Sequence, residues 1–126
     1  MINPQDFTKL LLASGFNFFT GVPDSTMAEW LKDLNGKQNH IAATSEGEAL
    51  SIASGYYLAS GKLGCVYLQN AGLGNMVNPL TSLCDKEVYG IPALLIIGWR
   101  GEPGGGHDEP QHIKMGKVTL KMLETL

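Results

Sequence analysis

The sequence has little positive charge, few cysteines and no long hydrophobic segment. Its 126 residues carry 9 basic against 12 acidic side chains, and the only arginine is Arg100. No basic run is present, so we expect no nucleic-acid partner. The longest apolar run, residues 91–98, is too short to span a bilayer, and no signal pattern precedes it, so we expect no membrane partner. Two cysteines, Cys65 and Cys84, make no disulfide framework, and the expected location is cytoplasmic.

Common phosphate and metal motifs are also missing. The segment 69–75, Gln-Asn-Ala-Gly-Leu-Gly-Asn, has neither Gly-Lys-Ser/Thr nor Gly-x-Gly-x-x-Gly, which weighs against a generic nucleotide-binding domain. The histidines and acids of residues 101–112 fit no zinc spacing, and we expect no metal site in this chain. Glycine, in contrast, is abundant: 16 residues, against an average of about 7%. Such a number indicates tight turns or a backbone close to a ligand.

Hydrophobic segments alternate with helical ones along one domain of ordinary size. Asn3 before Pro4 predicts a capped first helix, and Thr26 with Glu29 has the spacing of a capping box for the second. The alternation predicts an α/β fold with a parallel sheet, whose last strand is covered on both faces. The predicted strands are residues 16–20, 40–44, 63–69 and 91–97, and the predicted helices are 4–14, 26–35, 45–60, 75–84 and 118–126.

Polar or glycine-rich loops follow each predicted strand. In parallel sheets, ligands bind outside the carboxyl ends of the strands, so these loops should gather at one edge. The loops are residues 23–25, 45–46, 69–75 and 98–112.

Glu46 opens the third predicted helix, on the stripe that also carries Leu50 and Ala53. One interpretation is a first-turn carboxylate that the helix dipole favours. The other is a carboxyl group at the ligand edge that holds or passes a proton. The pattern alone leaves both open.

Arg100 follows the last predicted strand directly. At that edge, a guanidinium can bind an anionic group with two N–H donors, but it can equally be a solvated loop residue. The segment 101–112, rich in glycine and charge, is a candidate lid. The segment 69–75 has an equally plain interpretation as a tight turn between strand and helix.

Taken together, five motifs resemble the pyrimidine-binding domain of thiamine-diphosphate-dependent 2-keto acid decarboxylases. The similarity covers nearly the whole chain and is greatest to phosphonopyruvate decarboxylases, then to α subunits of sulfopyruvate decarboxylases. It implies a three-layer α/β/α fold. The motifs are Gly-Val-Pro-Asp-Ser at 21–25, Ser-Glu-Gly-Glu-Ala at 45–49 with 55–62, Gln-Asn-Ala-Gly-Leu-Gly-Asn at 69–75, Gly-Trp-Arg-Gly at 98–101 and Asp-Glu-Pro-Gln-His at 108–112.

The resemblance assigns roles to residues. It implies that the Glu46 carboxyl group binds the N1′ nitrogen of the aminopyrimidine ring and activates thiamine diphosphate, which makes Glu46 the catalytic residue. It places further residues at the cofactor, namely Pro23, Asn70, Gly72 and Asn75. It places others at a small anionic 2-keto acid substrate, namely Asp24, Ser25, Arg100, Asp108, Gln111 and His112.

The chain also departs from the family. Such enzymes bind the diphosphate through Mg²⁺ in a second domain that starts with Gly-Asp-Gly, and that motif is missing here. We therefore expect a separate diphosphate-binding domain or subunit, no activity without it, and self-association through an exposed strand edge. The predicted strands are fewer than the family's, so an N-terminal fragment, incomplete at its C-terminal end, is favoured over a short subunit.

These observations predict the pyrimidine-binding half of a carboxy-lyase that converts phosphonopyruvate to phosphonoacetaldehyde and CO₂. The α subunit of a sulfopyruvate decarboxylase is the main alternative. A non-catalytic subunit that keeps the fold is a further one, which the presence of Glu46 disfavours.

Overall fold

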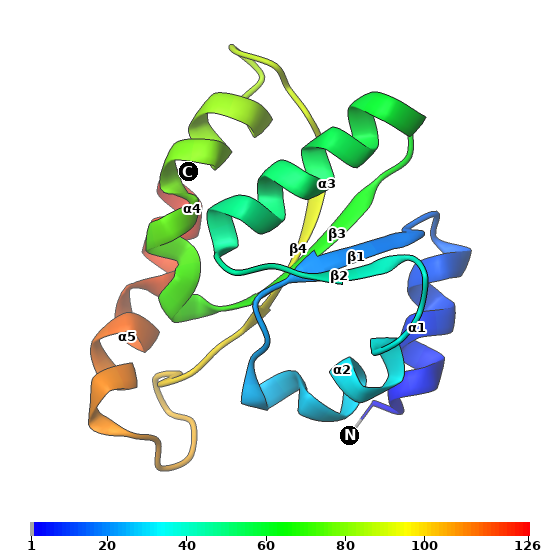
Figure 1. Ribbon diagram of the computed structural model, residues 1–126. Coiled ribbons are helices and arrows are strands. Elements are labelled where there is room, and N and C mark those ends of the chain that lie inside the picture. Colours follow the sequence, from blue (N-terminus) through cyan, green and yellow to red (C-terminus); the bar gives the residue numbers. More distant parts are fainter. Residues whose placement is uncertain (1) are drawn as a thin grey trace.

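A parallel sheet with helices on both faces forms the framework of the chain (Figure 1). The computed structural model describes residues 2–126, and its four strands lie in the order β2-β1-β3-β4. The predicted α/β class is confirmed. The strands are β1 (Phe18–Gly21), β2 (His40–Ala42), β3 (Gly64–Gln69) and β4 (Ala93–Gly98), and the helices are α1 (Pro4–Ala13), α2 (Ala28–Leu34), α3 (Glu46–Ser60), α4 (Leu73–Pro79) and α5 (Pro110–Thr125).

Two hydrophobic clusters hold the layers together. Helices α1 and α2 cover one face of the sheet, where Phe19, Trp30 and Tyr67 pack, and α3 and α4 cover the other (Figure 1). On the second face the small residues of α3, such as Ala49 and Ala53, lie flat against β3, which lets the helix approach closely. The central strands β1 and β3 are thus buried between two helical layers.

The order of the strands creates a crevice at the sheet's carboxyl edge. From β1 the chain moves outward to β2 and then returns to place β3 on the other side of β1. The loops after β1 and β3 therefore diverge to opposite faces, which is the point at which open α/β sheets bind ligands.

Three predicted helix starts are wrong, two of them in the middle of the chain. Thr26 does not cap α2; a 3₁₀ turn at Ser25–Met27 precedes the helix, and the Thr26 hydroxyl donates to Asp24 instead. The helix predicted for residues 75–84 begins earlier, with a 3₁₀ turn at Asn70–Gly72 before α4, and ends in a wider π-helical turn at Leu80–Cys84. Pro79, which lacks an N–H group, sits where the hydrogen-bonding pattern changes.

Predictions for the last strand and last helix also differ from the structure. Strand β4 pairs only with β3 and lies at the edge of the sheet, so its side chains are half-buried rather than covered on both faces. Helix α5 begins at Pro110, eight residues before the predicted start at Val118. Proline fits the first turn of a helix, but the polar residues after it carry no apolar periodicity that would indicate one.

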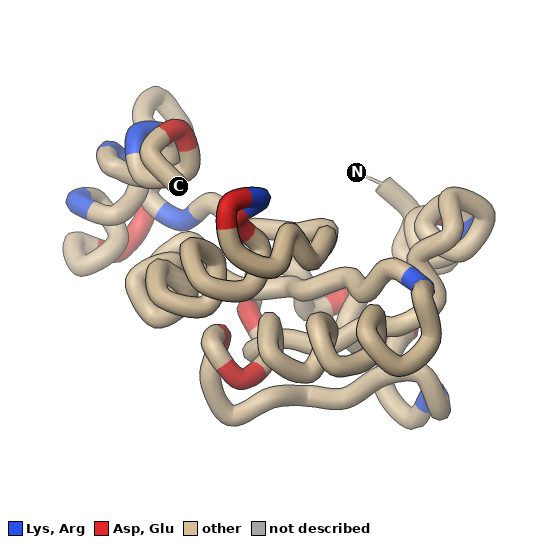
Figure 2. The backbone as a smooth tube through the Cα atoms, turned by 90° about the horizontal axis from the view of Figure 1, so that it is seen from above, with Lys and Arg blue, Asp and Glu red and all other residues tan. Residues whose placement is uncertain are grey.

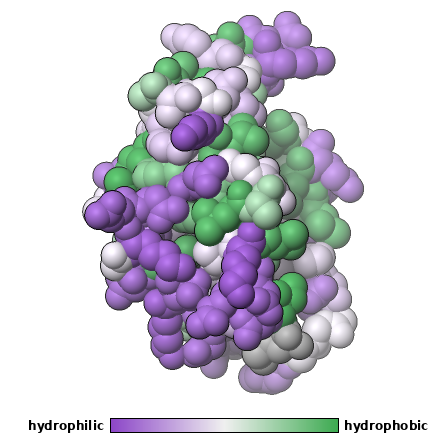
Figure 3. Space-filling model, turned by 90° about the vertical axis from the view of Figure 1, so that its right-hand side faces the viewer, coloured by the Kyte–Doolittle hydropathy of each residue, from purple (hydrophilic) through white to green (hydrophobic). Residues whose placement is uncertain are grey.

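The surface is mixed in charge and hydropathy. Basic and acidic positions are interspersed along the trace, and α5 carries three lysines (Figure 2). Hydrophobic side chains are exposed among polar ones on the face shown in Figure 3. Among the residues described, Leu58 is 71% and Tyr89 73% exposed. No helix within residues 2–126 has the length and hydrophobicity needed to cross a membrane.

Candidate functional site

The carboxyl ends of β1, β3 and β4 bring distant polar residues together. Asp24, after β1, is buried and accepts hydrogen bonds from Gln69 Nε2 at 2.8 Å and from the Thr26 hydroxyl. Gly98, at the end of β4, leaves room for this cluster, because a side chain there would collide with Asp24 and Thr26. The expected gathering of loops at one edge is confirmed for these strands.

Glu46 lies at the first position of α3, behind the N-cap Ser45. Its carboxylate extends over the turn after β3, into space that Gly72 leaves empty: a Cβ atom at position 72 would collide with Oε1. Asn75 Nδ2 donates to the other oxygen, Oε2, at 2.8 Å. The carboxylate is half-buried, and within residues 2–126 no donor occupies Oε1. One oxygen is therefore held by Asn75, and the other lies over the backbone of Gly72 without a hydrogen-bond donor among these residues.

The side chain of Asn70 is bound by partners within the protein, and its predicted place at the cofactor stays a prediction. It is fully buried, its Oδ1 accepts from Arg100 N at 3.1 Å, and its Nδ2 donates to Arg100 O and Thr119 Oγ1, both at 2.9 Å. Both amide hydrogens and the carbonyl oxygen are thus used inside the protein. Asn70 joins the ends of β3 and β4 to α5 and leaves no amide donor for a ligand.

Arg100 is held in place by its neighbours. Its Nε and Nη2 donate to the Asp108 carboxylate at 2.5–3.1 Å, and Nη1 donates to Ser25 Oγ at 3.1 Å. The hydrogen bonds from Arg100 hold the pKa of Asp108 well below its usual range, and Asp108 in turn raises the pKa of the guanidinium. Asp108 also accepts from the backbone N–H groups of Gly101 and Glu109, so it fixes the loop after β4.

A polar cavity of about 320 Å³ lies against the Arg100–Asp108 pair. Of the five N–H donors on a guanidinium, one on Nη1 and one on Nη2 remain after the contacts above. Because Asp108 offsets part of the positive charge, recognition of an anion here depends on directed donors. The lining residues are Thr26, Trp99, Arg100, Gly101, Glu102, Gly105, Gly106, His107 and Asp108.

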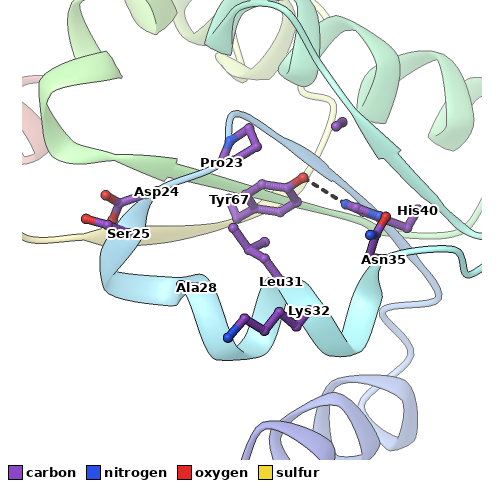
Figure 4. Close-up of a pocket in the computed structure, with 10 residues that line it drawn as sticks. Pro23, Asp24, Ser25, Ala28, Leu31, Lys32, Asn35, His40 and Tyr67 are labelled. Carbon is purple, nitrogen blue, oxygen red and sulfur yellow. Dashed lines mark hydrogen bonds between the residues drawn. The ribbon is translucent and has the colours of Figure 1, made fainter.

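A second cavity, of about 470 Å³, lies behind the loop of Pro23, Asp24 and Ser25 (Figure 4). Tyr67, from β3, points across β1 and its hydroxyl lies 2.8 Å from His40 Nε2. Gly21 permits this crossing, because a Cβ atom there would meet the tyrosine ring. Burial raises the pKa of Tyr67 to about 12 and lowers that of His40.

Four further residues that were predicted at the cofactor or the substrate lie in the segment after β1 or in the first turn of α5. Pro23 and Ser25 are exposed on the loop after β1. Gln111 is exposed in the first turn of α5, and His112 is half-buried, with its carbonyl against Gly101. Their roles stay predictions.

Sequence reasoning missed three residues of this site: Thr26, Tyr67 and Thr119. Thr26 is bound to Asp24, two residues away. Tyr67 and Thr119 are placed by contacts with distant segments, and no local signal marked them.

Comparison with known proteins decides the family. Residues 5–118 match the family described as "Thiamine pyrophosphate enzyme, N-terminal TPP binding domain". The chain belongs to this family. Phosphonopyruvate decarboxylase of Streptomyces viridochromogenes is 41% identical over 98% of this chain and 31% of its own length. Sulfopyruvate decarboxylase subunit alpha of Methanococcus maripaludis is 38% identical over 94% of this chain and 69% of its own length.

A solved structure supports the same assignment. An enzyme of Mycobacterium smegmatis described as thiamin diphosphate-dependent matches with a TM-score of 0.62 and 28% identity, over 74% of this chain and 18% of that one. The resemblance to thiamine-diphosphate-dependent decarboxylases, with phosphonopyruvate decarboxylases ahead of sulfopyruvate decarboxylase α subunits, is confirmed. The chain spans about a third of the length of the phosphonopyruvate decarboxylases that it matches.

The Glu46 region fits the pyrimidine part of this cofactor. A ring nitrogen needs one hydrogen-bonding oxygen, and Oε1, which accepts no hydrogen bond among residues 2–126, offers one. Within residues 2–126, no three or more His, Cys, Asp or Glu side chains come together in a group that could hold a metal ion.

Proposed function

We propose that this chain is the pyrimidine-binding part of a thiamine-diphosphate-dependent decarboxylase that acts on phosphonopyruvate. The observation that carries the proposal is the Glu46 carboxylate, which has one oxygen bound by Asn75 and the other directed over Gly72 at the ligand edge. Similarity at 41–43% identity to phosphonopyruvate decarboxylases supports the substrate.

The roles of this chain's residues follow from their contacts. Glu46 Oε1 would hold a proton shared with N1′ of the aminopyrimidine ring, and Asn75 would keep the carboxylate oriented for it. Gly72 would leave the Glu46 carboxylate in this position. When bound, thiamine diphosphate supplies the sink for the electron pair left by CO₂.

The substrate has two ends to place. The free N–H donors of Arg100 bind the acidic tail of the keto acid in the 320 Å³ cavity, with Asp108 and Ser25 fixing the guanidinium. Asp24 binds Thr26, which lines this cavity, and is assigned to the keto acid end. Gln111 and His112 close the site from α5.

The proposal requires further protein. A diphosphate-binding domain or subunit holds Mg²⁺ and the diphosphate, and residues 1–126 form the N-terminal domain of the longer enzyme. Exposed hydrophobic residues such as Leu58 and Tyr89 support burial in an oligomer. Among the residues described, Cys65 and Cys84 are free thiols, which supports a cytoplasmic location.

The second candidate substrate is sulfopyruvate. The chain covers 69% of the sulfopyruvate decarboxylase α subunit it matches, so a short chain with a separate partner is a real alternative to a fused enzyme. The intact mass of the protein from its own host separates them: several times 13.5 kDa supports a fused enzyme, and a mass near that value supports a subunit.

The deciding experiment uses the natural full-length protein, with its partner if one exists. CO₂ release from phosphonopyruvate and from sulfopyruvate is measured with and without thiamine diphosphate and Mg²⁺. Glu46→Ala should abolish release, while Glu48→Gln, an exposed carboxylate two residues away, should not. Turnover by Glu46→Ala near the parent rate contradicts the proposed role of Glu46, and release without the cofactor contradicts the proposed function.

A further inference from the structure

We propose that Thr119, on α5, is a positioning residue that sets Arg100 for the acidic tail of the substrate, acting through Asn70. This inference rests on the proposed function. Thr119 is 2% exposed and does not line the Arg100 cavity. Its hydroxyl accepts from Asn70 Nδ2 at 2.9 Å and donates to the carbonyl of Met115 at 2.6 Å.

Asn70 transmits the position of α5 to Arg100. Its side chain bonds both the N–H and the carbonyl of Arg100, as a neighbouring strand would, just beyond the end of β4. The second amide hydrogen is satisfied only by Thr119 among residues 2–126. Without that hydroxyl, a fully buried N–H loses its partner, and the amide group must turn to recover one. Any turn of the amide disturbs both bonds to the Arg100 backbone.

Helix α5 packs closely against the loop after β4. A Cβ atom at Gly116 would collide with the backbone of Gly101, and Trp99 Nε1 donates to the Gly116 carbonyl at 3.0 Å. Gly101 has φ of +67°, which suits glycine alone in this tight contact. Thr119 lies one turn from Gly116 on the same buried side of α5. Helix α5 thus contacts the loop at Trp99 and Gly101, on either side of Arg100, and Asn70 binds the Arg100 backbone between them.

The consequence is specific to the substrate's tail. Arg100 reaches Asp108 and Ser25 with its side chain, so a displaced backbone misdirects the two remaining N–H donors of this residue, which lines the cavity. Glu46 is bound by Asn75, whereas the Thr119 hydroxyl, among residues 2–126, is bound to Asn70 and Met115. Loss of the Thr119 hydroxyl should therefore weaken recognition of the tail and spare activation of the cofactor.

The test compares Thr119→Val, which keeps the shape but loses the hydroxyl, with Thr119→Ser, which keeps it, in the full-length enzyme. We expect Thr119→Val to raise KM for phosphonopyruvate about tenfold, as small misplacements of a binding group do. The kcat and the Kd for thiamine diphosphate should stay within about twofold, and Thr119→Ser should match the parent. Thr119→Ala replaces Thr119→Val if the latter does not fold.

Three outcomes overturn the inference: an unchanged KM in Thr119→Val, a parallel loss of kcat and cofactor affinity, or no rescue by Thr119→Ser. Failure of the proposed function looks different, because the parent enzyme itself then releases no CO₂ from either acid. In that case calorimetric titration with methylphosphonate, which needs no turnover, decides. Binding that weakens in Thr119→Val but not in Thr119→Ser supports the inference, and equal or absent binding overturns it.

Discussion

The carboxylate of Glu46 occupies the space that a side chain at position 72 would fill. Glycine at that position is therefore a requirement of the site and not of the backbone, because Gly72 has φ of −77°, which any residue adopts. The atoms that a Cβ would meet are the far end of a flexible side chain, so the chain can tolerate a methyl group by moving Glu46 away.

Gly72→Ala should consequently lower kcat of the complete enzyme by about tenfold to a hundredfold, while the fold remains intact, because Glu46 leaves its oriented position. The matched control is Gly74→Ala, two residues along, where a Cβ atom meets nothing within 4 Å. Steady-state kinetics and circular dichroism on both variants check this. Equal activity in the two variants would contradict the role of Gly72 in leaving space for the Glu46 carboxylate.

The Arg100–Asp108 pair should make stability depend on pH. Hydrogen bonds from Arg100 hold the pKa of Asp108 below its ordinary value of 3.8, so the unfolded chain takes up a proton more readily than the folded one. The resulting stabilisation is present above about pH 4 and is lost as the pH falls through lower values. Asp108→Asn should lower the free energy of unfolding at pH 7, and the difference from the parent should shrink at pH 3.

Urea unfolding at pH 7, 5 and 3 measures this. Asp6→Asn is the control: Asp6 pairs with Lys9 at 3.2 Å, but both side chains are mostly exposed, so its removal should cost about 0–1 kcal/mol. A difference between Asp108→Asn and the parent that is as large at pH 3 as at pH 7 would show that the ion pair is not the source.

Local signals predicted the parts of the fold that depend on neighbours in the chain. Asn3 caps α1 by accepting from the N–H groups of Gln5 and Asp6, as its position before the helix indicates. Ser45, predicted as the first residue of a helix, is the N-cap of α3. Glu46 was expected at the ligand edge because loops after parallel strands gather there. The predicted helix cap at Thr26 was wrong because the Thr26 hydroxyl donates to the buried Asp24 carboxylate.

Contacts between distant segments could not be predicted. Asn70 lies 30 residues from Arg100 and 49 from Thr119, so its motif suggested a ligand contact where the fold provides internal partners. Arg100 was predicted at the site, but its pairing with Asp108 depends on the path of the loop between them. That path depends on where α5 begins. The start at Pro110 could not be predicted, because the polar residues after it show no helical periodicity.

A buried network between α1 and α2 should contribute measurably to stability. Trp30 Nε1 donates to Thr8 Oγ1 at 3.1 Å, and the Thr8 hydroxyl lies 2.7 Å from Asp33 Oδ2. Thr8→Val leaves the indole N–H buried without its partner, so we expect a loss of about 1–3 kcal/mol in the free energy of unfolding. Thr81→Val, an exposed threonine bonded only within its own helix, is the control. Equal unfolding midpoints for the two variants would contradict the role of this network.

His40 should add a second pH dependence, at higher pH than Asp108. Burial lowers its pKa from the ordinary value of 6.5, and its Nε2 is paired with the Tyr67 hydroxyl. The unfolded chain therefore binds a proton first as the pH falls, so stability is fully present above pH 6.5 and declines below it. His40→Gln should abolish this decline, whereas His107→Gln, at an exposed loop position, should keep it. Thermal unfolding at pH 8, 6.5 and 5 measures the slope, and the same decline in His40→Gln as in the parent would assign it to another group.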